Sequence, residues 1–276
     1  MLEVLAPAKI NLVLEILARR QDGYHDVSTL LQTISLYDHL WLEETDREDI
    51  LTAEPDHIAT PDNLVLRALA ALRQYGHFPY LRVHLKKNIP IAAGLGGGSS
   101  DAASVLREVT RRYALPINQT TLGHIASRLG ADVPFFLEGG LQWGTGRGDL
   151  IQPCPVSLQG RILLYNPGYA LSTVSVFEQY AQMGQTFDSG QITARFLSNV
   201  SGGIEPIYGY NALWPVVAHL RPDLVVVKRK FADVGINMYL SGSGPTLWGL
   251  VDAESQKAAE VAQLVQESRV WYCEFV

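Results

Sequence analysis

The chain has 276 residues, a formal net charge of −6 and a hydrophobic fraction of 47%. The apolar content suits a globular core, while the acidic balance disfavours nucleic-acid binding, which depends on a basic surplus. No run of about 18 uncharged apolar residues is present, and Glu3 and Lys9 interrupt the apolar N-terminal stretch, so neither a membrane span nor a secretory leader is expected. Cys154 and Cys273 have no metal-binding spacing and favour free thiols in a reducing compartment. We expect a cytoplasmic protein.

The first half of the chain alternates apolar and polar residues at two places, which predicts strands over 9–16 and 81–86. In the first strand Lys9 and Asn11 fall on the polar face, which we expect to be exposed. Helical spacing of apolar residues then predicts helices over 101–113 and 121–129. Ser99 or Ser100 is the expected N-cap of the first of these helices, and Gly130 the expected C-cap of the second. Short strands are expected over 135–137 and 141–143.

The second half opens after the Pro153-Cys154-Pro155 stretch with a predicted strand over 161–165. Residues 183–210 show little regular pattern. A helix is predicted over 222–234, begun by Pro222, and its basic triplet Lys228-Arg229-Lys230 is expected to face water. The remaining expectations are a strand on each side of the turn at 241–245, a helix over 254–266 and a last strand over 270–275. This mixture of segregated strands and helices predicts an α+β fold.

A glycine-rich loop lies between the strand at 81–86 and the helix at 101–113. Glycine allows positive φ and lets a ligand approach backbone N–H groups closely, and the helix that follows directs its N-terminal donors and dipole to the same place. We therefore predict a site for the phosphates of a nucleotide. The predicted phosphate-binding residues are Pro90, Ala93, Gly94, Leu95, Gly96, Gly97, Gly98, Ser99 and Ser100. The alternative is a flexible turn without a ligand; the lysine of a P-loop and the third glycine of a dinucleotide fingerprint are both missing.

These residues resemble the signature of the GHMP kinases, a superfamily of small-molecule kinases. The resemblance covers residues 90–103, and it extends to Ala8-Lys9-Ile10-Asn11-Leu12 and to Ser241-Gly242-Ser243-Gly244-Pro245-Thr246. It implies two domains: residues 1–157 as an ATP-binding domain like the second domain of ribosomal protein S5, and residues 158–276 as a ferredoxin-like domain, with the active site between them.

A narrower resemblance points to one subgroup, whose members phosphorylate a methylerythritol linked to cytidine diphosphate. It rests on residues 20–25 (Arg-Gln-Asp-Gly-Tyr-His), 32–34, 36–38 and 130–136 (Gly-Ala-Asp-Val-Pro-Phe-Phe). It implies that ATP phosphorylates the 2-hydroxyl of the methylerythritol in the non-mevalonate route to isoprenoid precursors. Where this subgroup often has Asn-Asp-Leu-Glu, the chain has Asn211-Ala212-Leu213-Trp214, so we assign no catalytic role to that segment.

The resemblance also implies residue roles. Asp132 would be the general base, and Lys9 would favour its ionised form and stabilise the developing alkoxide. A turn-forming aspartate and a surface lysine are the structural alternatives. Asn11, Tyr24, His25 and Phe177 would bind the acceptor, Tyr24 by stacking on the cytosine ring and His25 at its edge. The residues expected beside the adenine are Asn63, Leu64 and Lys87, although Asn63 would serve equally as a helix cap.

The expected cofactors are ATP and Mg²⁺, but the sequence shows no dedicated carboxylate cage for the ion, which leaves its ligands unassigned. The expected partner is a small-molecule substrate rather than a nucleic acid or a membrane, and the expected state is a monomer or weak homodimer. Two other functions remain open: a GHMP kinase for homoserine, mevalonate or a sugar, and a regulator that binds nucleotide without catalysis.

Overall fold

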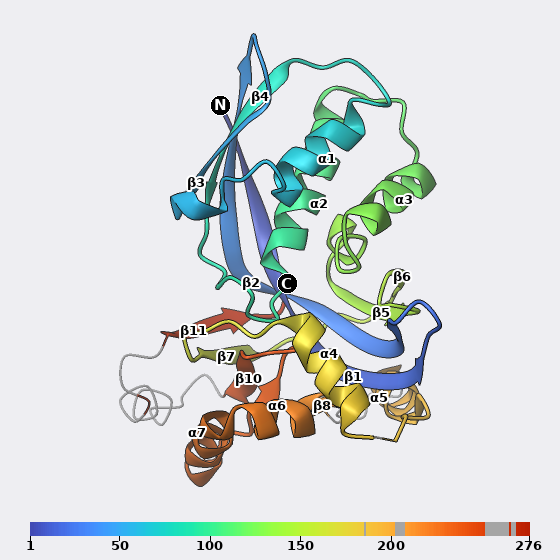
Figure 1. The fold of residues 1–276 in the computed structure, drawn as a ribbon, viewed down its shortest axis with the longest axis vertical. Helices are drawn as coiled ribbons and strands as arrows, with labels where there is room; N and C mark the ends of the chain where they lie inside the picture. Colours follow the sequence, from blue (N-terminus) through green and yellow to red (C-terminus); the bar gives the residue numbers. More distant parts are fainter. Residues whose placement is uncertain (185, 202–207, 252–264, 266–268) are drawn as a thin grey trace. The chain divides into compact units, whose positions relative to one another are not determined.

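A computed structural model describes residues 1–184, 186–201, 208–251, 265 and 269–276 of the chain (Figure 1). These residues form two compact units that interleave along the sequence. The first unit comprises Met1–Ala8, Leu36–Ile89 and Gly96–Gly139, and the second comprises Lys9–Ser35, Pro90–Leu95 and Gly140–Val276. The predicted domain boundary at 157/158 stays a prediction. Among the described residues, no helix combines the length and the hydropathy that a membrane crossing requires.

The first unit consists of a sheet with helices on one side of it (Figure 1). The strand order is β3-β4-β2, with β3 parallel and β2 antiparallel to β4. Leu40, Leu42, Val83 and Leu85 of these strands are buried, as are the apolar positions of α1 and α2, which pack on each other. The elements are the part of β2 (His25–Thr45) from Leu36 onward, β3 (Ile50–Glu54), η1 (Asp56–Ile58), α1 (Leu64–Leu72), β4 (Tyr80–Lys86), α2 (Gly97–Arg112), α3 (Gln119–Leu129) and η2 (Phe135–Leu137).

The second unit contains a four-stranded antiparallel sheet in the order β11-β7-β10-β9, together with strands that continue from β1 and β2. There β1 pairs in parallel with β8, and β2 pairs with β5, which pairs in turn with β6. Its elements are the part of β1 (Leu2–Arg19) from Lys9 onward, the part of β2 up to Ser35, β5 (Leu141–Thr145), β6 (Leu150–Pro153), β7 (Arg161–Asn166), α4 (Thr173–Gln182), α5 (Gln191–Ser201), β8 (Tyr210–Asn211), α6 (Trp214–Leu220), α7 (Pro222–Asp233), β9 (Tyr239–Leu240), β10 (Leu247–Val251) and β11 (Arg269–Glu274).

The structure confirms most predicted elements and corrects three. The segment 135–137 is a 3-10 helix rather than a strand, because Pro134 has helical dihedrals and the turn continues from it. Helix α2 begins at Gly97, so its N-cap is Gly96 and not a serine. Helix α5 lies in the stretch 183–210, where the sequence pattern is weak. The predicted helix over 254–266 lies, apart from residue 265, outside the described residues.

The polar face of β1 is buried, contrary to prediction: Lys9 is 3% exposed, Asn11 5% and Glu15 1%. The cause is that other groups of the second unit cover this face and form hydrogen bonds with its polar side chains. The Glu15 carboxylate accepts hydrogen bonds from the backbone N–H and the hydroxyl of Thr193 on α5, at 2.8 and 2.7 Å. Lys9 is therefore a buried side chain with a fixed hydrogen-bond partner, Asn11, and not a surface lysine.

Two glycine turns of the second unit meet backbone to backbone. Gly94 has φ of 77°, and a Cβ there would overlap the Ser241 carbonyl and lie 3.0 Å from the Gly244 nitrogen. The Ser241 hydroxyl donates to the Gly94 carbonyl at 2.9 Å. The Lys9 N–H donates to the Leu95 carbonyl at 3.0 Å. Gly94 is therefore fixed by the turn at 241–244, and the next residue, Leu95, is fixed by β1.

This packing predicts that Gly94→Ala destabilises the protein more than replacement of a glycine that has positive φ but no close neighbour. Gly168 is the matched control, because it has φ of 84° and no atom within 4 Å of a built Cβ. We expect Gly168→Ala to lose about 1–2 kcal/mol, the usual cost of a left-handed alanine, and Gly94→Ala clearly more. Chemical unfolding of the two variants measures the difference, and equal losses would contradict the close packing.

Candidate active site

The phosphate-binding loop that the sequence predicts ends at the start of α2, in the first unit. Gly96 is the N-cap with φ of 70°, whereas Gly97 and Gly98 lie inside the first helical turn and do not need positive φ. A Cβ at Gly98 would meet only the Leu64 side chain, at 3.8 Å, so this side of the helix start is open. The first N–H groups of the helix have no acceptor within it, so they are available to bind an anion, as the sequence predicts.

Asp132 lies in the turn that follows α3. Gly130 ends that helix, and the Val133 N–H closes the turn on the Gly130 carbonyl at 3.2 Å. A Cβ at Gly130 would lie 3.8 Å from the Ser99 hydroxyl oxygen of α2. The first unit therefore places the turn that carries half-buried Asp132 next to the helix start with its free donors.

Lys87 is buried in an ion-pair network under the same helix. Its ammonium donates to Asp38 and, at 2.7 Å, to Asp101, and its side chain is only 7% exposed. Burial raises the pKa of the Asp101 carboxyl to about 7. The positive charge of Lys87 lowers this pKa, and the negative charge of Asp38 raises it. A Cβ at Gly97 would lie 3.0 Å from the Lys87 ammonium, so this network sits directly beneath the loop.

Lys9 in the second unit is oriented by its neighbours on the sheet. Its ammonium donates to the Asn11 side-chain oxygen at 2.7 Å, and the Asn11 amide donates to the Thr29 hydroxyl at 2.8 Å. A Cβ at Gly242 would lie 3.3 Å from the Lys9 ammonium, so the turn at 241–244 borders it. Thr29, which the sequence analysis did not single out, completes this chain by donating to the Val13 carbonyl.

His25 is buried among aromatic rings of α4. Its ring centroid lies 5.2 Å from that of Phe177 and 5.9 Å from that of Tyr180. Burial, with a smaller contribution from the charge of Arg19, lowers the pKa of His25, which keeps the imidazole neutral at pH 7 with one donor and one acceptor nitrogen.

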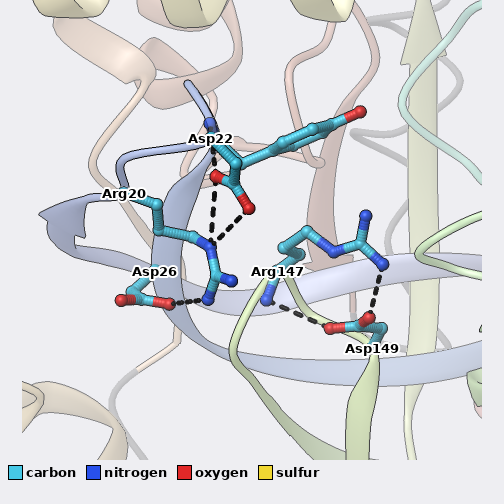
Figure 2. A network of polar contacts seen from close by, with 6 residues as sticks. Arg20, Asp22, Asp26, Arg147 and Asp149 are labelled. Carbon is cyan, nitrogen blue, oxygen red and sulfur yellow. Dashed lines mark hydrogen bonds and ion pairs between the residues drawn. The ribbon is translucent and has the colours of Figure 1, made fainter.

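Tyr24 is exposed by 57%. Figure 2 shows the polar contacts of Arg20 with Asp22 and Asp26, and of Arg147 with Asp149. The Arg147 guanidinium lies 5.3 Å from the centroid of the Tyr24 ring and pairs with Asp149 at 2.8 Å. The Tyr24 N–H donates to Asp22, which pairs with Arg20. Arg147 is a second residue that the sequence analysis missed, because nothing in the pattern of its turn relates it to Tyr24.

Asn63 caps α1, since its side chain accepts from the Val65 N–H at 2.9 Å. Leu64 opens that helix and borders the open side of Gly98. Together with buried Lys87, these residues lie in the first unit, and their contact with adenine stays a prediction. Within the described part of the chain, no cluster of three or more His, Cys, Asp or Glu side chains could hold a metal ion.

Known proteins that resemble the chain cover its full length. Residues 63–140 match the model of the GHMP kinases N terminal domain. A protein of Syntrophus aciditrophicus named 4-diphosphocytidyl-2-C-methyl-D-erythritol kinase is 35% identical over 98% of this chain and 97% of its own. The chain belongs to the 4-diphosphocytidyl-2-C-methyl-D-erythritol kinase family. It is therefore a small-molecule kinase.

Solved structures agree with this assignment. A crystal structure of 4-(cytidine 5'-diphospho)-2C-methyl-D-erythritol kinase superposes on the kinase with a TM-score of 0.82 at 32% identity, covering 99% of both chains. Homoserine kinase from Cytophaga hutchinsonii has a TM-score of 0.71 at 18% identity, covering 98% of this chain and 93% of its own, which shows the shared fold alone. The predicted two-domain α+β GHMP kinase fold is confirmed.

The Lys87 network predicts a pH-dependent stability of the kinase. The pKa of Asp101 is raised from 3.8 to about 7 in the fold, so the folded state favours its protonated form. This contribution is complete below pH 4 and is lost as the pH rises through about 7. Between pH 5 and 8 we expect wild type to lose stability relative to Asp101→Asn, while the exposed-loop variant Asp46→Asn follows wild type. Unfolding midpoints at four pH values test this, and parallel curves for wild type and Asp101→Asn would contradict it.

Proposed function

We propose that the kinase transfers the γ-phosphoryl group of ATP to the 2-hydroxyl of 4-diphosphocytidyl-2-C-methyl-D-erythritol, a step toward isoprenoid precursors in the cytoplasm. The proposal is supported by two features of the second unit: Asn11 orients the Lys9 ammonium, and a buried, neutral His25 lies beside Phe177. An oriented ammonium can stabilise negative charge on a reacting hydroxyl, and a neutral imidazole beside an aromatic ring can bind a planar base. Full-length relatives with the corresponding name support the choice of substrate.

The start of α2 fits a nucleotide triphosphate. The open side of Gly98 admits an oxygen close to the backbone, and the helix dipole favours negative charge there. The side chain of Ser99 is half-buried at this place and would supply a hydroxyl to phosphate or to Mg²⁺. When bound there, Mg²⁺ would supply charge neutralisation at the phosphate oxygens. We propose that Gly96, Gly97, Gly98, Ser99 and Ser100 of the first unit hold the phosphates, while phosphate contacts of Pro90, Ala93, Gly94 and Leu95 stay a prediction.

Asp132 is the proposed general base. Its turn adjoins the phosphate-binding helix start through the close approach of Gly130 to Ser99. A carboxylate there accepts the proton of the acceptor hydroxyl as the oxygen attacks phosphorus. Lys9, held by Asn11 in the second unit, is the proposed residue that stabilises negative charge developing on an acceptor alkoxide. Because Asn11 already bonds both Lys9 and Thr29, we propose that it positions Lys9 in addition to its predicted contact with the acceptor.

The cytidyl part of the acceptor is proposed to bind at Tyr24, His25 and Phe177. Stacking on Tyr24 tolerates any base, so the preference for cytosine has to come from hydrogen bonds. A neutral imidazole offers one donor and one acceptor for the edge of the base. Burial makes the loss of such a bond costly, because the partner is left unpaired.

The roles of Asp132 and Lys9 predict a rate defect without a binding defect. We expect Asp132→Asn to lower kcat by roughly 10²–10⁴-fold, the usual contribution of a general base. Lys9→Met, which keeps the length of the side chain, should also lower kcat. Steady-state kinetics and calorimetry with a non-hydrolysable ATP analogue separate rate from affinity. The control is Glu138→Gln, an exposed carboxylate near Asp132 in sequence. Near-native turnover of Asp132→Asn, or a selective loss of ATP binding in Lys9→Met, would contradict these roles.

The roles of Tyr24 and His25 predict different specificity defects. Tyr24→Ala should raise the acceptor KM and leave the preference for cytidyl over uridyl substrates intact. His25→Ala should raise the acceptor KM and also narrow that preference, since the edge contacts are lost. The KM for ATP should stay near native in both. Kinetics with the two nucleotide-linked acceptors provide the test, and unchanged acceptor use in both variants would remove the cytidyl assignment.

A further inference from the structure

A cavity of 280 Å³ lies in the second unit among β8, the start of α6 and α7. Aromatic and apolar side chains form much of its wall, including Tyr180, Tyr210, Trp214 and Leu240. Lys228 and Asp188 bring one positive and one negative charge to the same wall. None of these residues belongs to the proposed catalytic or acceptor-binding set, so the cavity needs an explanation of its own.

Lys228 is the cation of this cavity, and it is half-buried rather than solvated as the sequence predicts for the basic triplet. Its ammonium lies 4.5 Å from the centroid of the Trp214 ring and 5.8 Å from that of Tyr239. Burial lowers the pKa of Lys228. Aromatic faces attract the ammonium but do not neutralise it. A bound anion would stabilise it.

Two other polar side chains of the wall, Asp188 and Asn211, are already paired. Asp188 accepts from the Ile16 N–H at 2.9 Å and from the Tyr210 hydroxyl. The Asn211 amide donates to the carbonyls of Leu240 and Gly242 at 3.0 and 2.9 Å. The anion that suits the cavity therefore carries one charge, because the fixed negative charge of Asp188 disfavours a second. Its body should be flat and apolar to pack on the aromatic wall.

We propose that this cavity is a binding site for a small monocarboxylic acid with a flat, apolar body. The carboxylate pairs with Lys228, and the body lies against Trp214 and the neighbouring apolar wall. The cavity adjoins the proposed acceptor site through Tyr180, whose ring contacts His25. Binding of the acid is measured without substrate or ATP, so the test does not depend on the proposed function.

Benzoate is the probe, and two analogues of similar shape test its charge. Calorimetry on the full chain is expected to show saturable, equimolar binding of benzoate, with weaker binding of neutral benzamide and of dianionic phenyl phosphate. This comparison uses only the wild-type protein. Absence of benzoate binding at millimolar concentration, or equal binding of benzamide, would overturn the proposal.

Variants then place the site. Lys228→Met keeps the apolar stem and should weaken benzoate binding by about tenfold or more, since a hydrogen bond to a charged group contributes about 1.5–3 kcal/mol. Trp214→Glu puts a carboxylate next to the ammonium and should abolish binding. The matched control Arg229→Met removes an exposed cation from the same helix and should bind benzoate like wild type. Native affinity in Lys228→Met, or an equal loss in Arg229→Met, would overturn the proposal, and thermal unfolding verifies that each variant is folded.

Discussion

The contact between Gly94 and the turn at 241–244 is the constraint on which the surroundings of Lys9 in the second unit depend. Two backbones lie so close there that the absence of a side chain at Gly94 is required. The same turn borders the ammonium of Lys9, and the Leu95 carbonyl accepts from the Lys9 N–H. Three segments that are far apart in the sequence are thus fixed to one another by main-chain contacts. Such contacts hold a loop in place without long side chains that would fill the space for a ligand.

The buried lysines Lys87 and Lys9 have different hydrogen-bond partners. Lys87 lies between Asp38 and Asp101, where the carboxylates compensate its charge and tie the strand end at residues 87–89 to α2. Lys9 is instead held by the neutral amide of Asn11. In our account Lys87 serves to position the start of α2, and Asn11 orients Lys9 for chemistry at the acceptor hydroxyl. The buried charge around Lys87 also makes the stability of the fold sensitive to pH.

Local signals in the sequence predict the local structure well. Alternation predicts β4 and the middle of β1, glycine and proline mark the ends of α3 and α7, and the glycine loop precedes a helix as expected. What the sequence could not predict depends on partners distant along the chain. The burial of Lys9 and Glu15 requires α5 and the turn at 241–244. The pairing of Lys87 requires Asp38, which lies on another strand. Periodicity describes one element at a time and carries no information about which element covers which face.

The central claim is that the kinase phosphorylates one hydroxyl of a cytidyl-linked acceptor. The most direct measurement is mass spectrometry, with phosphorus NMR, of the products formed from ATP, Mg²⁺ and 4-diphosphocytidyl-2-C-methyl-D-erythritol. Our account predicts ADP and an acceptor that carries one additional phosphate on the 2-hydroxyl, with much slower reaction of homoserine and mevalonate. Consumption of ATP without a phosphorylated acceptor, or equal phosphorylation of the three acceptors, would contradict it.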